Sequence, residues 1–422
     1  MKVIQSFWSK PFLEANSDES ARFKGGWLNA NFFLYSSLLS CLKFKEHYGN
    51  VTLFTDDYGK NLLIDTFEIP YLSVNTSLNT ISNYPPELWA LGKILTYSLQ
   101  NEPFIHADTD VFIWDKFPPE FSNVSLFAQN VEINFPKYQE VLELIQKQFI
   151  NSPSVLLHNY QATGIIEAFN AGIIGGTNIN FFKELAQLVF LFIDSNLNQL
   201  NNIPVGDFNM VYEQMLGMNL AKQQGIEVKF LRTAMNEAFS GVMKFHLLPL
   251  RENYIHAVGY AKKSLQVCEQ IQMRLQYEFP KEYQKLNSLI RKYQLFKDES
   301  LPITDVRKEF LYKTYHWLET EQWSKMLETP FRLNPNCTFE ELADESMELH
   351  YISPLNQTQE KIIIEDWDFI LGYFEKPMTT LQIVDELMQN EDLSANFTHT
   401  QLSEKVFSYI MDRCLYHEIL VK

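Results

Sequence analysis

The pattern of apolar and polar positions divides the first half of the chain into alternating predicted strands and helices. Short apolar runs rich in Val, Ile and Phe predict strands, and longer stretches with apolar residues three or four positions apart predict helices. Strands are expected at Val3–Trp8, Asn50–Thr55, Phe104–Trp114, Val124–Ala128 and Ile226–Leu231, and helices at Phe32–Tyr48, Tyr58–Leu63, Leu88–Ser98, Asn178–Asn196 and Asp207–Leu220. This alternation predicts an α/β sheet whose ligand sites lie at the carboxyl ends of the strands.

The second half of the chain has a different pattern, with longer helical stretches. Pro280 separates two of the predicted helices, because proline interrupts a helix. The predicted helices are Ser264–Phe279, Lys281–Leu295, Val306–Leu327, Thr379–Met388 and Gln401–Asp412, and Leu415–Val421 is a predicted strand. We therefore expect an α/β domain over residues 1–263, a helical segment over 264–350 and a small winged-helix-like α+β module over 355–422.

The charge of the chain limits its partners. The 422 residues carry a formal net charge of −17, which argues against nucleic acid or an anionic membrane surface as the main partner. The C-terminal module is also acidic, with twelve Asp or Glu and five Lys or Arg from residue 355 onward. DNA binding is therefore not expected of it. Docking of a peptide or protein, formation of a homodimer and a purely stabilising role stay open for this module.

Features that would direct the chain to a membrane or an oxidising compartment are not found. Polar residues follow the first methionine too early for a signal peptide, and the apolar run Leu188–Ile193 is too short to span a bilayer. The four cysteines are widely separated and form no metal-binding pair. We expect no transmembrane segment, reduced thiols and a cytoplasmic location.

The stretch Pro103–Lys116 contains the first candidate site. Asp108 and Asp110 interrupt two apolar runs, so they are expected where a buried strand ends. Two carboxylates one residue apart suit a divalent cation such as Mg²⁺ or Mn²⁺, which can bind a diphosphate. A solvated turn with two surface acids is the competing interpretation, because short motifs often match by chance.

Polar or small residues also follow other predicted elements. Asp56 comes directly after the second predicted strand, where it either contacts a ligand or begins a helix. Lys93 is the one cation in an apolar helix, and it reaches either a phosphate or solvent. The sequence Asn170-Ala171-Gly172 allows a ligand to approach the backbone closely and offers an amide to hydroxyl groups. A glycine-containing strand end without a ligand is the alternative there.

A later helix carries candidate catalytic residues. Asp207, Glu213 and Gln214 lie among apolar neighbours in the stretch Asp207–Leu220. Polar groups on such a helix face either a pocket or the surface, and the sequence leaves both open.

The end of the α/β domain carries a candidate metal ligand. His256 ends a short apolar run and is followed by Gly259 and Lys262. An imidazole can complete a metal site formed by two aspartates. Glycine allows the backbone to turn tightly, and lysine supplies a positive charge to a diphosphate.

These features together resemble the nucleotide-sugar glycosyltransferases of the GT-A fold. The similarity is to the metal-dependent enzymes related to glycogenin, galactinol synthase and the bacterial lipopolysaccharide galactosyltransferases, and to an uncharacterised bacterial group with the same core. It rests on the Asp-x-Asp strand, the Asn-Ala-Gly strand and the His-x-x-Gly-x-x-Lys motif, within residues 1–263. The Lys-Pro-Trp ending of those families is absent, since Lys262 precedes Lys263 and Ser264, and their Asp-Gln motif has no clean copy.

The resemblance implies a Rossmann-like mixed sheet with flanking helices and a bound Mn²⁺ or Mg²⁺ ion. The metal ligands would be Asp108, Asp110 and His256. The residues expected at the nucleotide sugar are Lys93, Asp56, Asp108, Asn170, Ala171, Gly172, Gly259 and Lys262. The candidates for a catalytic role are Asp207, Glu213 and Gln214.

The expected function is transfer of a sugar from a nucleoside diphosphate sugar, UDP-linked by expectation, to an unknown acceptor glycan, lipid or peptide. The metal and Lys262 would stabilise the leaving diphosphate, and the resemblance implies retention at the anomeric carbon. One alternative is an inactive GT-A-fold protein that docks a peptide or protein. Another is a nucleotidyltransferase, although the Gly-rich basic loop that such enzymes carry after the first strand is absent from Gln5–Phe12.

Overall fold

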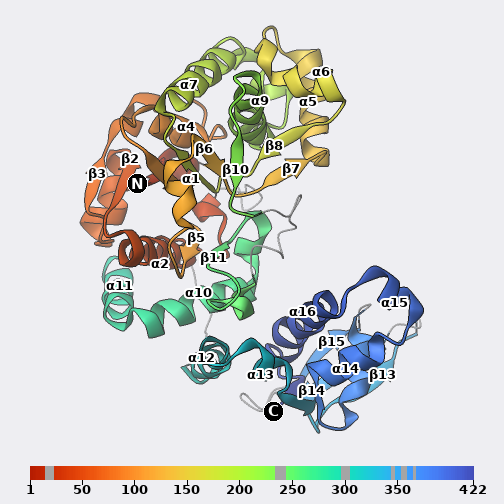
Figure 1. Cartoon of the computed structure of the whole chain (residues 1–422). Coiled ribbons are helices and arrows are strands. Elements are labelled where there is room, and N and C mark those ends of the chain that lie inside the picture. The colour runs from red at the N-terminus through yellow and green to blue at the C-terminus, as the bar shows by residue number, and fades with distance from the viewer. Residues whose placement is uncertain (15–22, 233–243, 296–304, 344–346, 353–358, 365–366) are drawn as a thin grey trace. The chain divides into compact units, whose positions relative to one another are not determined.

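The computed structural model describes residues 1–14, 23–232, 244–295, 305–343, 347–352, 359–364 and 367–422 (Figure 1). The chain divides into two compact units. The first comprises Met1–Met243 and Asn253–Leu301, and the second comprises Lys244–Glu252 and Pro302–Lys422. The short segment Lys244–Glu252 therefore belongs to the second unit, although segments of the first unit precede and follow it in the sequence.

The first unit is built on a seven-stranded mixed sheet with the strand order β10-β6-β9-β4-β1-β2-β3. The strands are β1 (Lys2–Phe7), β2 (Val51–Thr55), β3 (Ser73–Asn75), β4 (Phe104–Ala107), β6 (Leu126–Ala128), β9 (Ile173–Gly176) and β10 (Val228–Phe230). The described pairings are parallel except for those of β9, which runs antiparallel to both β4 and β6. The α/β class predicted from the sequence is confirmed.

Alternate residues of the central strands pack into two apolar clusters, as expected for strands covered on both faces. One cluster contains Val3, Ile105, Phe127 and Ile173, and the other contains their neighbours Ile4, Phe104, Leu126 and Ile174. The helices of the unit are α1 (Ser9–Glu14), α2 (Ala30–Tyr48), α3 (Asp57–Lys60), α4 (Leu91–Ser98), α5 (Pro136–Gln148), α6 (His158–Thr163), α7 (Ile179–Asp194), α8 (Val205–Met210), α9 (Leu216–Gln223), α10 (Leu265–Glu278) and α11 (Pro280–Tyr293).

Two short antiparallel pairs of strands complete the first unit. β5 (Val111–Ile113) pairs with β11 (Tyr254–His256), and β7 (Val131–Ile133) pairs with β8 (Glu167–Phe169). The first pair connects the acidic turn with the segment that carries His256, although the two lie far apart in the sequence.

The second unit contains helices and two small antiparallel sheets. Its helices are α12 (Asp305–Thr320), α13 (Trp323–Leu327), α14 (Thr380–Leu387), α15 (Glu391–Asn396) and α16 (His399–Tyr409). One sheet has the order β16-β12-β17 and the other β13-β14-β15. The strands are β12 (Pro330–Leu333), β13 (Thr338–Glu341), β14 (Met347–Ile352), β15 (Gln359–Ile363), β16 (Met378–Thr379) and β17 (Leu420–Val421).

The segment 264–350, expected to be helical throughout, is divided between the two units. α10 and α11 belong to the first unit, where Lys43 of α2 pairs with Glu278 at 2.9 Å and Tyr35 donates to Asn287 at 2.7 Å. After α13 the chain turns to strands, and β12, β13 and β14 lie before or across residue 350. These strands were not among those predicted from the sequence. The winged-helix-like arrangement of the C-terminal module stays a prediction.

None of the helices in the described part of the chain is both long and apolar enough to cross a membrane.

Candidate functional site

The acidic turn lies between strands of two different sheets. β4 ends just before it and β5 begins just after it, and β5 pairs with β11, which ends at His256. The backbone N–H of Asp108 donates to the carbonyl of Gly172 at 2.8 Å. The N–H of Ala257 donates to the carbonyl of Asp110 at 3.0 Å. The turn is therefore fixed to the Asn-Ala-Gly segment on one side and to β11 on the other.

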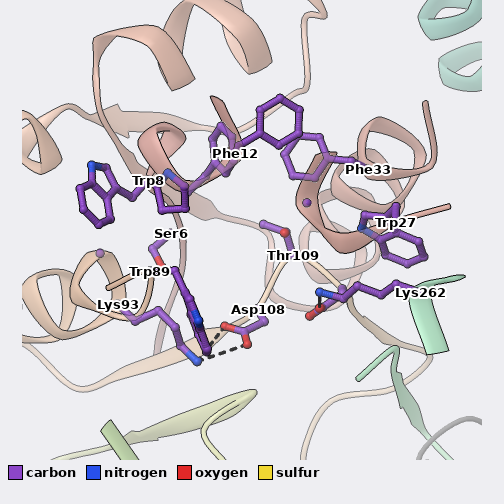
Figure 2. A pocket seen from close by; sticks show the side chains of 15 residues that line it. Ser6, Trp8, Phe12, Trp27, Phe33, Trp89, Lys93, Asp108, Thr109 and Lys262 are labelled. Atoms are coloured by element: carbon purple, nitrogen blue, oxygen red, sulfur yellow. Dashed lines mark hydrogen bonds and ion pairs between the residues drawn. The ribbon is translucent and has the colours of Figure 1, made fainter. Parts of the chain in front are cut away.

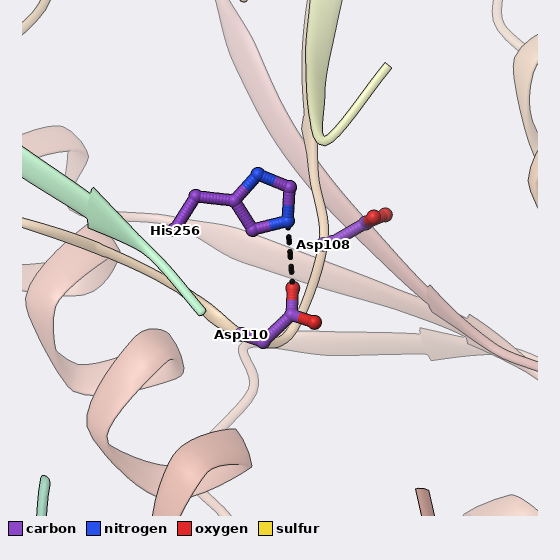
Figure 3. Close-up of side chains that lie close together, drawn as sticks. All are labelled: Asp108, Asp110 and His256. Atoms are coloured by element: carbon purple, nitrogen blue, oxygen red, sulfur yellow. Dashed lines mark ion pairs between the residues drawn. The ribbon is translucent and has the colours of Figure 1, made fainter. Parts of the chain in front are cut away.

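Asp108, Asp110 and His256 form a cluster that can hold a divalent metal ion. Each offers one ligand atom, and these atoms lie within 4.8 Å of one another. His256 Nε2 is 3.4 Å from Asp110 Oδ1, and Figure 3 shows the two side chains pointing toward one another with Asp108 beside them. Asp110 Oδ1 is buried and makes no hydrogen bond with any residue in the described part of the chain. A buried carboxylate oxygen without a hydrogen bond is costly unless a cation binds it, so these residues fit a metal.

Asp110 is held in its ionised form. Burial favours the neutral carboxyl, but the ammonium of Lys262 and the ring of His256 outweigh burial and hold the pKa of Asp110 well below its usual range. A metal ligand must be deprotonated, so this environment prepares Asp110 for a cation.

Lys93 is fully engaged by the protein. Its Nζ lies 3.1 Å from Asp108 Oδ1 and 2.9 Å from Glu213 Oε1. It also donates to the carbonyl of Ala171 at 3.0 Å. Burial alone would lower the pKa of Lys93, but the Asp108 and Glu213 carboxylates outweigh it and raise that pKa. Because an ammonium has three N–H donors, Lys93 holds Asp108 in place and has no donor left for a phosphate.

Lys262 has a different set of contacts. It lies in the 3₁₀ turn Gly259–Lys263 directly after β11, and Gly259 begins this turn with a φ of +54°, a conformation that favours glycine. The ammonium forms an ion pair with Asp110 Oδ2 and lies 5.8 Å from the centre of the Trp27 ring. No second acceptor among the described residues hydrogen-bonds to it, so donors remain for a ligand.

Glu213 and Gln214 lie in a π-helical turn, Val211–Met215, between α8 and α9. Such turns are frequent at functional sites. Besides its ion pair with Lys93, Glu213 accepts a hydrogen bond from the Tyr97 hydroxyl at 2.9 Å and is only 1% exposed. Burial raises the pKa of Glu213, and the attraction of Lys93 offsets this only in part.

Gln214 belongs to a chain of hydrogen bonds that fixes the Asn-Ala-Gly segment. Its Oε1 accepts from the N–H of Ala171 at 2.9 Å, and its amide donates to the Tyr138 hydroxyl at 3.0 Å. Tyr138 donates to Glu132 Oε2 at 2.6 Å, and Asn170 donates to Glu132 Oε1 at 3.1 Å. Both the Asn170 and the Gln214 side chains are thus used to shape this segment.

Gly172 is required by the position of His256. A Cβ atom added at Gly172 would overlap the imidazole ring, which packs directly on the glycine backbone. Asn170 Oδ1 accepts a hydrogen bond from the N–H of Gly172 at 3.0 Å and so fixes the glycine. The glycine is therefore needed for packing against His256, and whether a ligand approaches this segment stays a prediction.

Two predicted site residues have other contacts. Asp56 caps α3, because its carboxylate accepts from Gly59 N–H at 2.8 Å and from the backbone and hydroxyl of Ser9 at 3.0 and 2.8 Å. Asp207 lies in the first turn of α8, and its carboxylate is 3.9 Å from the exposed Lys137. Among the described residues, neither Asp56 nor Asp207 forms a hydrogen bond or ion pair with Asp108, Asp110 or His256.

A pocket opens beside the cluster and is lined largely by aromatic side chains (Figure 2). Phe7, Phe12 and Phe33 form one wall, with ring centres 4.8 to 5.8 Å apart. The remaining lining residues that bear on the chemistry are Ser6, Trp8, Trp27, Trp89, Lys93, Asp108, Thr109, Asp110 and Lys262. Figure 2 labels Trp89, Asp108 and Lys262 among the side chains that line this pocket. The cavity volume is about 100 Å³.

Sequence analysis missed Gln129, whose Oε1 lies 2.7 Å from His256 Nδ1. It also missed Tyr97, which bonds Glu213, and His106, which lies 2.9 Å from the Ser6 hydroxyl. The signal for Gln129 was present, because this amide directly follows the predicted strand Val124–Ala128, at the edge where ligands bind. Tyr97 and His106 carried no such signal, since they lie inside an apolar helix and an apolar strand.

Comparison with known proteins gives a family whose function is not described. A family model, "Family of unknown function (DUF6734)", matches residues 1–289, which include every residue of the cluster and its pocket. No curated protein matches the chain by sequence.

Three of the solved structures that match the chain are described as glycosyltransferases. The galactosyltransferase LgtC in complex with donor and acceptor sugar analogues matches at 9% identity with a TM-score of 0.26, over 50% of this chain and 70% of LgtC. GlyE of Streptococcus pneumoniae TIGR4 matches at 10% identity with a TM-score of 0.31, over 69% of this chain and 64% of GlyE. The bifunctional enzyme WbbM matches at 13% identity with a TM-score of 0.27, over 55% of this chain and 38% of WbbM. At such TM-scores the function has to be argued from the site.

Proposed function

The chain belongs to the DUF6734 family, and for this member we propose a metal-dependent glycosyltransferase that moves a sugar from a nucleoside diphosphate sugar to an acceptor. The observation that carries the proposal is the convergence of three metal ligands, Asp108, Asp110 and His256, beside a pocket that Lys262 also faces. A metal site beside an available ammonium group suits a diphosphate, which needs both charges neutralised. The intact ligand cluster disfavours an inactive binding protein of the same fold.

The metal would be held by Asp108, Asp110 and His256, and Mn²⁺ and Mg²⁺ both suit these ligands. When bound, it would supply positive charge to the oxygens of the leaving diphosphate. Lys93 keeps the Asp108 carboxylate in position, since its own donors are occupied by the protein.

Lys262 is proposed to bind the diphosphate directly. Its ammonium contacts Asp110 Oδ2 and lines the pocket, so its other donors can point at phosphate oxygens. Gly259 allows the tight turn that brings Lys262 back to the acidic turn. The cavity of about 100 Å³ has room for the diphosphate end of a donor, and the aromatic residues around it suit the faces of a base or a sugar ring.

The sugar is proposed to lie toward Ala171 and Gly172, where the backbone is fixed by Asn170 and Gln214. In the reaction, the bond between C1 of the sugar and the phosphate oxygen breaks, and its electron pair leaves with the nucleoside diphosphate. An acceptor hydroxyl oxygen forms the new bond to C1 and releases its proton. Of the predicted catalytic residues, Glu213 and Gln214 border this region, and Asp207 is left out because it pairs with the surface residue Lys137.

The proposal is tested by donor turnover. The purified chain is incubated with Mn²⁺ and a panel of UDP-, GDP- and CDP-sugars, and release of the free nucleoside diphosphate is measured. Asp110→Ala is expected to abolish release, whereas Asp115→Asn, an exposed acid in the same stretch, is expected to leave it unchanged. Metal-independent release, or release that survives Asp110→Ala, would contradict the proposal. With an acceptor in hand, the anomeric configuration of the product by NMR tests the expected retention.

A further inference from the structure

The side-chain amide of Gln129 contacts His256 at the ring nitrogen that does not face Asp110. Gln129 follows β6 and is 1% exposed, and its Oε1 lies 2.7 Å from His256 Nδ1. The other end of the amide, Nε2, donates to Asn130 Oδ1 at 3.2 Å. Because Asn130 Oδ1 can only accept, the oxygen of the Gln129 amide is the end that faces His256.

This orientation determines which nitrogen of His256 carries the proton. An amide oxygen accepts and never donates, so Nδ1 of the neutral ring must be the N–H that donates to Gln129. Nε2 is then left with its lone pair, and it is Nε2 that faces Asp110 Oδ1 at 3.4 Å. A metal requires this tautomer, because it binds the lone pair of a neutral imidazole.

The backbone of Gln129 is also held by hydrogen bonds. Its N–H donates to the carbonyl of Asn170 at 3.2 Å, and its carbonyl accepts from the N–H of Arg232 at 2.9 Å. Gly172 packs directly against the His256 ring, and there is no space for a Cβ atom at this position. The ring is thus fixed in both rotation and tautomer by parts of the chain distant in sequence.

We propose that Gln129 is a positioning residue for the metal centre, which fixes His256 in the Nδ1–H tautomer and directs Nε2 at the metal. This inference rests on the proposed metal-dependent function, but it concerns the ring and the metal and does not depend on which sugar is transferred. Gln129 does not contact the substrate in this account, and it acts only through His256.

The test uses the full chain and Mn²⁺ as the probe. Mn²⁺ affinity is measured by titration calorimetry for the wild type, Gln129→Leu and Gln129→Glu. Leucine keeps the approximate size and removes the acceptor, and glutamate keeps an acceptor. Gln129→Leu is expected to weaken Mn²⁺ binding by about 10- to 100-fold, the usual effect of losing such a partner. Gln129→Glu is expected to bind Mn²⁺ at least as well as the wild type. Gln139→Leu, the same change at an exposed position on α5, controls for the substitution itself.

A second measurement separates positioning from a loss of folding. The ¹⁵N shifts of the histidine rings, recorded at a pH at which the rings are neutral and with the His256 signals identified by their loss in His256→Gln, report the tautomer without any metal. The wild type is expected to show a protonated Nδ1, and Gln129→Leu is expected to lose this fixed pattern while its melting temperature stays close to that of the wild type. Wild-type Mn²⁺ affinity in Gln129→Leu, or a protonated Nε2 in the wild type, would overturn the inference alone. Absence of Mn²⁺ binding to the wild type would overturn the proposed function as well.

Discussion

His246 and His256 are close in sequence and both buried, but they lie in different units and have different surroundings. His246 Nδ1 is 2.9 Å from Asp412 Oδ1, and its Nε2 is 2.9 Å from the Ser408 hydroxyl. His256 Nδ1 lies 2.7 Å from Gln129 Oε1, and its Nε2 faces the carboxylate of Asp110 at 3.4 Å. Both ring nitrogens of His246 have hydrogen-bond partners, whereas Nε2 of His256 is available to a metal ion.

The difference separates a structural histidine from a binding one. With both nitrogens bonded, His246 ties the segment Lys244–Glu252 to α16 and the turn after it, and nothing remains for a metal. His256 is also held in place, by Gln129 and Gly172, but its Nε2 faces the carboxylate of Asp110. Burial alone does not distinguish the two, and the partner of the second ring nitrogen does.

The largest effect is expected from exchanging each histidine for glutamine. His256→Gln should weaken Mn²⁺ binding by more than about 100-fold, because it removes a ligand and not only its support. His246→Gln should leave Mn²⁺ binding unchanged and destabilise the second unit by about 1 to 3 kcal/mol, through unsatisfied buried partners. Calorimetric Mn²⁺ titration and thermal unfolding of both variants check this. Loss of Mn²⁺ binding in His246→Gln would show that the two regions are not separate in function.

A smaller effect is expected from moving the His256 ring without removing it. Gly172→Ala places a methyl group where the ring packs, so the imidazole must leave its present position. Mn²⁺ affinity should fall by about 10- to 100-fold, as for a misplaced ligand. Gly206→Ala is the matched control, since a Cβ there meets no atom within 4 Å. Unchanged Mn²⁺ binding in Gly172→Ala would mean that the ring position does not matter.

The two lysines of the site allow a further comparison. Lys262→Met should weaken binding of UDP in the presence of Mn²⁺ by about 10-fold, the loss of one charge-assisted hydrogen bond. Lys93→Met should lower the free energy of unfolding by about 3 kcal/mol, because it leaves Glu213 buried without its cation, and should weaken Mn²⁺ binding because Asp108 loses the contact that positions it. Calorimetry and denaturant unfolding distinguish the two outcomes. If Lys262→Met destabilised the fold and left UDP binding intact, the assignment of the two lysines would be reversed.

The smallest effect concerns His417, which shares a unit with His246. Burial, then the charges of Arg413 and Arg307, lowers the pKa of His417 to about 4. The unfolded chain takes up a proton near pH 6.5 and the folded chain does not, so stability is lost as the pH falls from 6.5 toward 4. Between pH 7 and 5 the loss should be about 1 kcal/mol after allowance for partial exposure. Urea unfolding, followed by a signal from the second unit, should show this pH dependence of the unfolding free energy in the wild type and not in His417→Gln.

The sequence was sufficient to predict several strands of the main sheet and to single out two of the candidate metal ligands. Periodicity located β1, β2, β4 and β6, and the rule that ligands lie at carboxyl ends of strands singled out Asp108 and Asp110. Asp108 and Asp110 lie in one short motif, where local order determines their separation, whereas His256 comes beside them through the pairing of β11 with β5.

Other features depended on strand pairing that no local pattern reveals. The role of Lys93 could not be predicted, because its partners Glu213 and Ala171 are brought to it by separate elements. Gln129 reaches His256 only because β6, β9 and β11 converge. For Asp56 the sequence left a ligand contact and a helix start open, because a strand end and a helix start coincide there, and in the structure Asp56 caps α3.

The most direct test of the central claim is calorimetric binding of UDP with and without Mn²⁺, on the wild type and on Asp110→Ala. The account predicts UDP binding that requires Mn²⁺ and is lost in Asp110→Ala, with the fold of the variant intact by circular dichroism. UDP binding that is independent of Mn²⁺, or that persists in the variant, would contradict the assignment of Asp108, Asp110 and His256 as a metal centre for a nucleoside diphosphate.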